Sequence, residues 1–200
     1  MRLLSDEDVR ALHAKYAPTQ EAFDLVHSHC ETVWRIAEQL LDRREFGVDT
    51  ELDAELVRVG CLLHDIGVYR LYDADGGFDH AGYIRHGILG YEILADEGFP
   101  EAVCRFCSHH TGVGLTRADV RKQGLPLPVA DYLAETVEEE LVMYADKFHS
   151  KSDPPRFVPA DEFARHVRRF GDEKVTAFEE MCGRFGVPDL AAVDSGTAPS

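Results

Sequence analysis

The stretch that decides the fold is residues 56–67, which read LVRVGCLLHDIG. Between Leu56 and His64 the only charged residue is Arg58, so a helix over 53–66 is apolar on nearly every side. A helix of this kind packs at the centre of a domain. It ends in His64 and Asp65, and an ionised carboxylate is costly to bury unless it is paired or binds a metal ion. The alternative is a helix end exposed to solvent, and this dipeptide alone does not decide between the two.

The rest of the chain also shows helical spacing of its apolar residues. They recur at steps of three and four, and Gly and Pro residues separate the segments. No alternating segment is long enough to predict a strand. We expect a first helix after Ser5 and others over 20–46, 53–66, 85–97, 100–110, 116–123, 136–149, 160–169 and 172–185, with Gly47 and Gly67 ending two of them. The expected fold is all-α, in a single domain over 1–188 with a flexible tail over 189–200.

Several polar residues interrupt the apolar faces of these helices. His29 shares a face with Val33 and Ile36 and should point inward, whereas His27 shares the wet side of the helix with Glu31. His86 has Gly90 on its face, His110 lies on an apolar stripe, and Asp146 is the only acid in residues 141–148. Taken singly, each is better explained as a satisfied core histidine or an exposed helix edge.

Taken together, the inward residues indicate a metal site. They come from five helices, and one bundle can bring them to a single core, as metal ligands converge in helical bundles. Imidazole nitrogen with carboxylate oxygen suits Fe, Mn, Co, Ni or Zn better than Ca or Mg alone. The six candidates are His29, His64, Asp65, His86, His110 and Asp146.

In this order the six residues resemble the HD-domain superfamily of metal-dependent phosphohydrolases. The superfamily takes its name from the pair that is His64-Asp65 here, and the segments HGILG at 86–90 and YADK at 144–147 also fit. The resemblance covers about residues 20–150 and leaves the helices over 160–185 outside it. Residues 98–101 and 135–139 are similar to a small, poorly characterised archaeal and bacterial subfamily.

The resemblance implies a site with two divalent ions, drawn from Fe, Mn, Co, Ni, Zn or Mg. One ion would be held by His29, His64, Asp65 and Asp146, and the second by His86 and His110 with Asp65 bridging. His64 and Asp65 would be the catalytic pair. Many relatives carry a lysine near the position of Val68 that helps to bind phosphate, and Arg70, Arg85 or Lys147 are the candidates to replace it here.

The activity that the resemblance implies is hydrolysis of a small phosphate ester, such as a nucleotide or a phosphomonoester, by a metal-activated water. Two alternatives stay open. The same six ligands would suit a di-iron oxygenase that cleaves a C–C or C–P bond with O2. The chain would otherwise be a non-catalytic, metal-binding regulatory protein.

Composition narrows the choice of partners. The chain has 21 basic and 37 acidic residues, a net charge of −16, and no basic cluster, which argues against nucleic acid polymers and membrane surfaces. It has no 18-residue apolar run and no signal-peptide pattern, so we expect a cytoplasmic protein. The five cysteines, including the pair Cys104 and Cys107, are expected in the core. The helices over 160–185 are expected to cap the bundle, with a homodimer surface or a lid as the alternatives.

Overall fold

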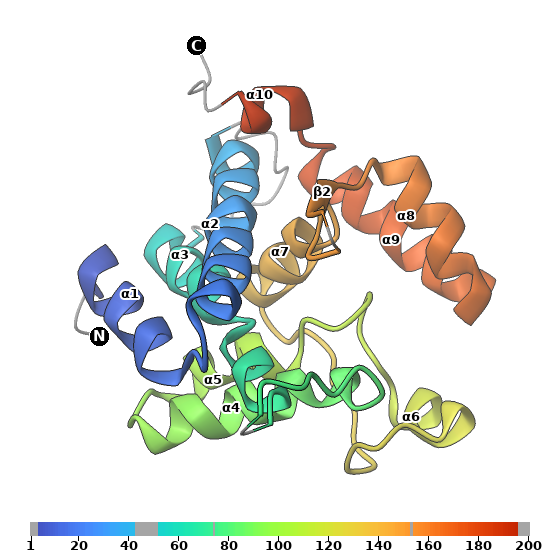
Figure 1. Cartoon of the computed structure of the whole chain (residues 1–200). Coiled ribbons are helices and arrows are strands. Elements are labelled where there is room, and N and C mark those ends of the chain that lie inside the picture. Colours follow the sequence, from blue (N-terminus) through green and yellow to red (C-terminus); the bar gives the residue numbers. More distant parts are fainter. Residues whose placement is uncertain (1–3, 43–51, 74, 153, 196–200) are drawn as a thin grey trace.

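The computed structural model describes residues 4–42, 52–73, 75–152 and 154–195. This described part is a bundle of helices, which confirms the predicted all-α class (Figure 1). Its one sheet pairs two short antiparallel strands, with His149 opposite Phe157. The elements are α1 (Asp6–Tyr16), α2 (Gln20–Asp42), α3 (Ala54–Leu63), η1 (Ile66–Leu71), η2 (Tyr83–Arg85), α4 (His86–Asp96), α5 (Glu101–Ser108), α6 (Arg117–Gln123), α7 (Val137–Asp146), β1 (His149–Ser150), β2 (Arg156–Phe157), α8 (Ala160–Val167), η3 (Arg168–Phe170), α9 (Asp172–Phe185) and α10 (Leu190–Asp194).

Helices α2 and α3 form the centre of the bundle. Asp53 caps the N-terminus of α3, where its side chain accepts a hydrogen bond from the Leu56 N–H at 3.0 Å. It packs against α2, α5 and α7, so its C-terminal end lies in the core. Although α2 is 23 residues long, neither it nor any other described helix is apolar enough to cross a membrane. The predicted end of α2 at Phe46 and Gly47 lies outside the described residues.

The chain approaches itself closely where η1 meets α4. An ideal Cβ on Gly67 would lie 2.0 Å from the His86 carbonyl oxygen and 2.2 Å from the Gly90 nitrogen, so no side chain fits at Gly67. We predicted that Gly67 ends the central helix, but the chain continues as the 3-10 helix η1. The glycine instead lets the first turn of α4, with His86, pack directly beside Asp65.

Helix α7 is shorter than predicted, ending at Asp146 instead of residue 149. The Val158 N–H donates to the Phe148 carbonyl at 2.9 Å, and β1 pairs with β2. This strand pairing replaces the last helical turn that the sequence pattern predicts. It also turns residues 149–151 back towards the centre of the bundle.

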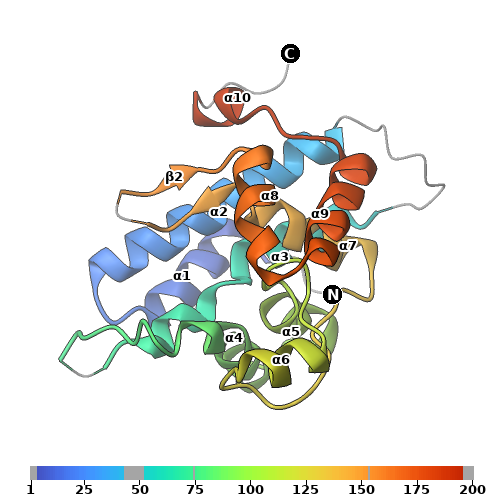
Figure 2. The ribbon, with the colours of Figure 1, turned by 90° about the vertical axis from the view of Figure 1, so that its right-hand side faces the viewer.

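The C-terminal helices pack on the bundle as a cap. Phe178 of α9 is buried against Tyr144 and Phe148, with ring centroids 5.7 and 6.1 Å apart, and Figure 2 shows α8 and α9 together beside α7. Where a flexible tail was expected from residue 189, the structure has the short helix α10. It begins at Asp189, whose backbone N–H donates to Gln39 of α2 at 2.7 Å. Residues 196–200 of the expected tail lie outside the described part.

Four of the five cysteines are buried core residues, as expected, whereas Cys182 is only half-buried. Cys30, Cys61, Cys104 and Cys107 are buried and free. The Cys107 thiol donates to the Leu63 carbonyl at 3.3 Å, at the end of α3. Burial raises the pKa of Cys107 well above its ordinary value, which argues against a reactive thiolate here.

Candidate metal centre

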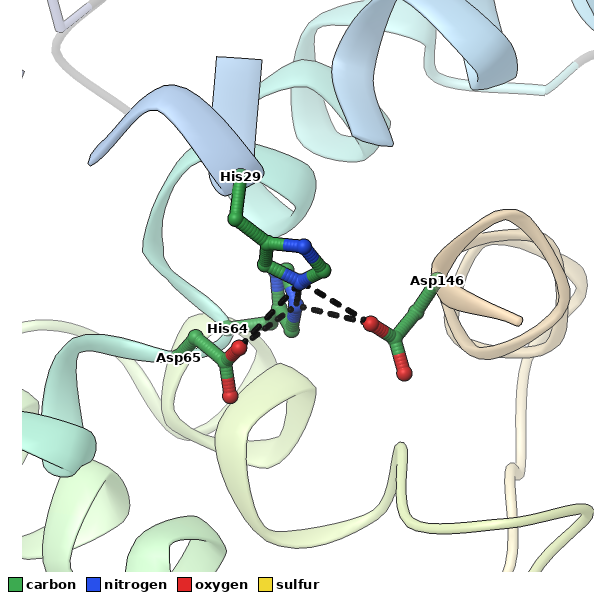
Figure 3. Close-up of side chains that lie close together, drawn as sticks. All are labelled: His29, His64, Asp65 and Asp146. Atoms are coloured by element: carbon green, nitrogen blue, oxygen red, sulfur yellow. Dashed lines mark hydrogen bonds and ion pairs between the residues drawn. The ribbon is translucent and has the colours of Figure 1, made fainter. Parts of the chain in front are cut away.

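Four side chains from three helices converge in the core and form the first group: His29, His64, Asp65 and Asp146 (Figure 3). His29 lies in α2, His64 and Asp65 directly follow α3, and Asp146 is the last residue of α7. His29 Nε2 lies 3.2 Å from Asp65 Oδ2, 3.0 Å from Asp146 Oδ1 and 3.3 Å from His64 Nε2. His64 Nε2 lies 3.5 and 3.4 Å from the same two oxygens. The four candidate ligand atoms are within 4.8 Å of one another, close enough to share one ion.

Asp65 also belongs to a second group, with His86 and His110. Its other oxygen, Oδ1, lies 3.4 Å from His86 Nε2 and 3.5 Å from His110 Nε2, and these two nitrogens are 3.0 Å apart. His86 is the first residue of α4, and His110 follows the end of α5 by two residues. Asp65 therefore presents one carboxylate oxygen to each group.

Three histidines are held through their outer ring nitrogens. The Nδ1 atoms of His64, His86 and His110 lie 2.8, 2.6 and 2.9 Å from the carbonyl oxygens of Cys61, Tyr83 and Phe106. Because a carbonyl only accepts, each Nδ1 carries the hydrogen, so Nε2 is the nitrogen that each ring can offer to a metal ion. Burial lowers the pKa of His86 to about 3 and also lowers that of His110, so both rings are neutral near pH 7.

The inner surface of the second group therefore consists of acceptors, namely Asp65 Oδ1 and the Nε2 atoms of His86 and His110. Asp65 Oδ1 is buried, and among the described residues it has no hydrogen-bond partner. The Nε2 lone pairs of His86 and His110 also face each other across 3.0 Å. Such an arrangement is unfavourable unless a cation lies among the acceptors. The residues thus fit one transition-metal ion in each group, and the binding itself stays a prediction.

Each carboxylate of the centre also has a lysine partner. Lys147 donates to Asp146 Oδ2 at 2.6 Å and to the His110 carbonyl at 2.9 Å. The Lys151 ammonium contacts Asp65 Oδ2. Burial alone raises the pKa of a carboxyl group, but the charge of Lys151 holds the pKa of Asp65 well below its usual range, and the charge of Lys147 does so for Asp146. Both acids are therefore ionised near pH 7.

Two residues at the centre were not predicted from the sequence, His149 and Lys151. His149 Nδ1 lies 2.8 Å from His29 Nδ1, and the two rings stack with centroids 5.1 Å apart. His149 follows Asp146 by three residues, and in the helix predicted over 136–149 this spacing puts both on one side, which was a usable signal although the helix ends at Asp146. Lys151 gave no such signal, because the turn into β1 that brings it to Asp65 was not predicted.

Of the three side chains expected to help bind phosphate, only Lys147 lies at the centre. Arg70 instead pairs with two acids of α4, Glu92 at 3.0 Å and Asp96 at 3.4 Å. Arg85 is exposed at the end of η2. Neither arginine lines the pocket beside the centre, so we do not assign them a role in binding.

The prediction that His27 faces solvent is wrong. Its residue surface is 7% exposed, and its ring stacks on Phe23 with centroids 4.9 Å apart and meets the ring of His13 edge-on at 5.1 Å. His13 belongs to α1, which covers this side of α2. The pattern of one helix does not reveal a second helix packed on its polar side. His27 belongs to neither group.

A pocket of about 470 Å³ opens beside the first group. Its inner wall includes Tyr83, Asp146, Lys147, His149 and Lys151. A second wall comes from residues 111–115, before α6. The far wall comes from β2 and the C-terminal helices and includes Arg156, Phe163, His166, Arg169, Phe170 and Lys174. The C-terminal cap thus also forms one side of the pocket.

The sequence is similar to a known family and to parts of longer proteins. The family model described as HD domain matches residues 26–151, more than half of the chain. The chain is 34% identical over 150 residues, 75% of its length, to a tRNA (cytidine(56)-2'-O)-methyltransferase of Picrophilus torridus. It is 42% identical over 96 residues, 48% of its length, to an uncharacterised protein of Methanocaldococcus jannaschii. It spans only 38% and 50% of the length of these two curated relatives.

Solved structures share the fold. They are crystal structures of the HD domain of the phosphodiesterase PgpH of L. monocytogenes, one of them in complex with cyclic-di-AMP. Their TM-scores are 0.52 and 0.51, at 16% and 15% sequence identity. The matches cover 88% and 96% of this chain and 95% and 98% of the solved chains. At this level of identity the likeness establishes the arrangement of the helices.

Proposed function

The chain belongs to the HD-domain family, and we propose that it is a metal-dependent phosphohydrolase. The observation that carries the proposal is the shared carboxylate. Asp65 offers Oδ2 to the first group and Oδ1 to the second, and the other candidate ligand atoms are imidazole nitrogens and a carboxylate oxygen of Asp146. Two divalent ions that share a carboxylate are typical of enzymes that hydrolyse phosphate esters. The phosphodiesterase name of the solved relatives supports the same reaction class.

The metal ions would supply an activated water and positive charge for the phosphoryl oxygens. The protein side chains fix the ligands in place. Lys147 holds Asp146 through Oδ2 and leaves Oδ1 turned towards His29. Burial lowers the pKa of His149 to about 4, so its neutral ring can accept the Nδ1 hydrogen of His29 and leave His29 Nε2 as a lone pair.

For the substrate we propose a small anionic phosphate ester, such as a nucleotide or a phosphomonoester. The pocket volume of about 470 Å³ lies within the usual range for small-molecule sites. Basic side chains outnumber acidic ones along its walls, although the chain as a whole carries a net charge of −16. The basic residues are Lys147, Lys151, Arg156, Arg169 and Lys174, and the acidic ones are Asp146 and Glu162.

The far wall of the pocket lies beyond the part of the chain that the family model matches. The rings of Phe163, His166 and Phe170 line it, and all three residues follow residue 151. Flat rings of this kind suit a planar group such as a nucleobase. We therefore propose that the family core provides the reaction centre and that the C-terminal segment selects the rest of the substrate.

The methyltransferase name describes longer relatives, and the chain spans 38% of the first of them. Two groups of histidine and carboxylate ligands support hydrolysis better than methyl transfer, which needs no metal-activated water. The di-iron oxygenase and the non-catalytic regulatory protein would use the same side chains, so they are the alternatives that an experiment must separate.

The test begins with protein stripped of metal and reloaded separately with Mn, Fe, Co, Ni, Zn or Mg. For each form we measure phosphate release from nucleotides and phosphomonoesters and ring opening of cyclic dinucleotides to linear products, together with O2 uptake by the iron form. We expect hydrolysis with at least one metal and a loss of about a hundredfold or more in Asp65→Asn, because even outer partners of ligands contribute 10- to 100-fold. If none of the metal-loaded forms hydrolyses any of these substrates, the proposal is contradicted. O2 uptake with a diol or a hydroxyphosphonate would then favour the oxygenase, and neither activity would favour a regulatory role.

A further inference from the structure

Lys151 reaches the metal centre from the loop that follows β1. Its side chain is only 14% exposed, and its ammonium contacts Asp65 Oδ2. The same ammonium lies 6.0 Å from the centroid of the Tyr83 ring. Both Lys151 and Tyr83 line the pocket. The ammonium therefore lies where the buried carboxylate meets the pocket.

The two lysines of the centre differ in which carboxylate oxygen they contact. Lys147 donates to Asp146 Oδ2, whereas the oxygen of Asp146 that faces the histidines of the first group is Oδ1. Lys151 contacts Asp65 Oδ2, and this same atom faces those histidines at 3.2 and 3.5 Å. An ion in the first group would need the oxygen that Lys151 holds. It would leave the contact made by Lys147 intact.

We propose that Lys151 is a displaceable counter-ion of the metal centre. Its ammonium neutralises Asp65 while the first group holds no metal ion, and it moves away from Asp65 into the pocket when an ion binds. There the ammonium binds an anionic group of the ligand, and this second part rests on the proposed phosphohydrolase function.

The charges at the centre give the reason for this exchange. A carboxylate as buried as Asp65 needs a positive partner, and the ammonium is the partner that it has. A divalent ion at Oδ2 would replace that partner and repel the ammonium. The flexible four-carbon stem of lysine lets the ammonium move while the backbone stays in place. The pocket offers it the face of Tyr83, solvent and any bound anion.

The first test compares Lys151→Met with Lys122→Met, which removes the same charge from an exposed position on α6. Metal-free Lys151→Met should melt about 5–10 °C below wild type, because Asp65 loses its counter-ion. Its first group should bind Mn²⁺ about tenfold more tightly, because no ammonium competes for Oδ2. Affinity is measured by competition with a chelator in the His86→Ala background, which leaves the first group complete. Lys122→Met should change neither quantity.

An equal Mn²⁺ affinity in Lys151→Met and wild type would overturn the counter-ion role. If Lys151→Met does not fold without metal, the decisive comparison moves to the Asp65→Asn background. The carboxylate charge is absent there, so adding Lys151→Met should not lower the melting temperature further. A further loss as large as in the wild-type background would mean that Lys151 stabilises the fold in another way, and would also overturn the proposal.

The second part is tested with inorganic phosphate and the metal-loaded protein. Lys151→Met should weaken phosphate binding about tenfold, and Lys151→Arg should retain most of it, because the guanidinium keeps the charge. Unchanged phosphate affinity in Lys151→Met would overturn the anion-binding role. None of these measurements uses hydrolysis, so they stay informative if the proposed function fails.

Discussion

Replacement of Asp65 by asparagine should prevent both metal ions from binding, whereas a change confined to one group should spare the other. The carboxylate gives Oδ2 to the first group and Oδ1 to the second. Asparagine keeps the shape of the side chain, but it removes the charge and places an N–H donor where one group needs a ligand. We expect two ions per chain in wild type, one in His86→Ala and fewer than one in Asp65→Asn.

The size of the effect follows from linkage between metal binding and folding. An ion present at 100 times its Kd stabilises the folded state by about 2.7 kcal/mol per site, so two sites contribute about 5 kcal/mol. In a protein of this size, 1 kcal/mol shifts Tm by about 2–4 °C. Metal should therefore raise the Tm of wild type by about 10–20 °C, that of His86→Ala by about half as much, and that of Asp65→Asn by about 2 °C or less.

The assay combines elemental analysis of the purified variants with thermal melts in the presence of metal and of a chelator. Asp96→Asn is the matched control. It makes the same chemical change at a side chain that is 72% exposed and pairs only at the surface with Arg70. It should bind two ions and keep the full thermal shift. Two ions per chain in Asp65→Asn, with an undiminished shift, would refute the shared-carboxylate geometry.

Three more predictions test other parts of the structure. His149→Phe should weaken metal binding at the first group by about 10- to 100-fold, because His29 loses the ring nitrogen that orients it. Competition with a chelator measures the metal affinity. An affinity equal to that of wild type would contradict the role of His149 in orienting His29. His13 has its pKa lowered from 6.5 to about 4 by burial, so it contributes stability above pH 6.5 that is lost as the pH falls towards 4. Urea unfolding at pH 7 and pH 5 should show a steeper loss, by roughly 2 kcal/mol, in wild type than in His13→Gln, and parallel losses would count against this. Gly67→Ala should lower Tm by about 5 °C or more and remove the second ion, because its Cβ would overlap the His86 carbonyl; a Tm and metal content equal to wild type would show that the backbone can adjust.

The sequence was most informative where a single helix decided the outcome. The single charged residue between Leu56 and His64 predicts that α3 lies at the centre of the bundle, and the structure has it there, in contact with α2, α5 and α7. The apolar spacing around His29 predicts that it points inward, and its side chain is fully buried. The resemblance to the HD superfamily then supplied the grouping of the six side chains, which periodicity alone left open.

The sequence was least informative where a second element decides the environment. His27 lies on the polar side of α2, but α1 covers that side. The spacing of apolar residues within one helix does not reveal this contact with a second helix. Its position in the chain, shortly after His64-Asp65, made Arg70 a candidate for binding the phosphate of a substrate. In the structure Arg70 forms ion pairs with Glu92 and Asp96 of α4 instead. Lys151 depends on a turn set by only two paired residues in each strand, too short for any alternating pattern.

The charge of the chain also has a different meaning once the fold is known. Each acid of the centre faces a lysine, and basic side chains outnumber acidic ones along the pocket, so the excess of acids lies on other parts of the chain. At physiological ionic strength, charges on the surface are largely screened beyond about 8 Å. A small anion inside the pocket therefore responds mainly to the local basic residues, whereas a polymer would extend onto the acidic surface and be repelled there. For this reason we expect a small phosphate ester to reach the centre in preference to a phosphodiester chain.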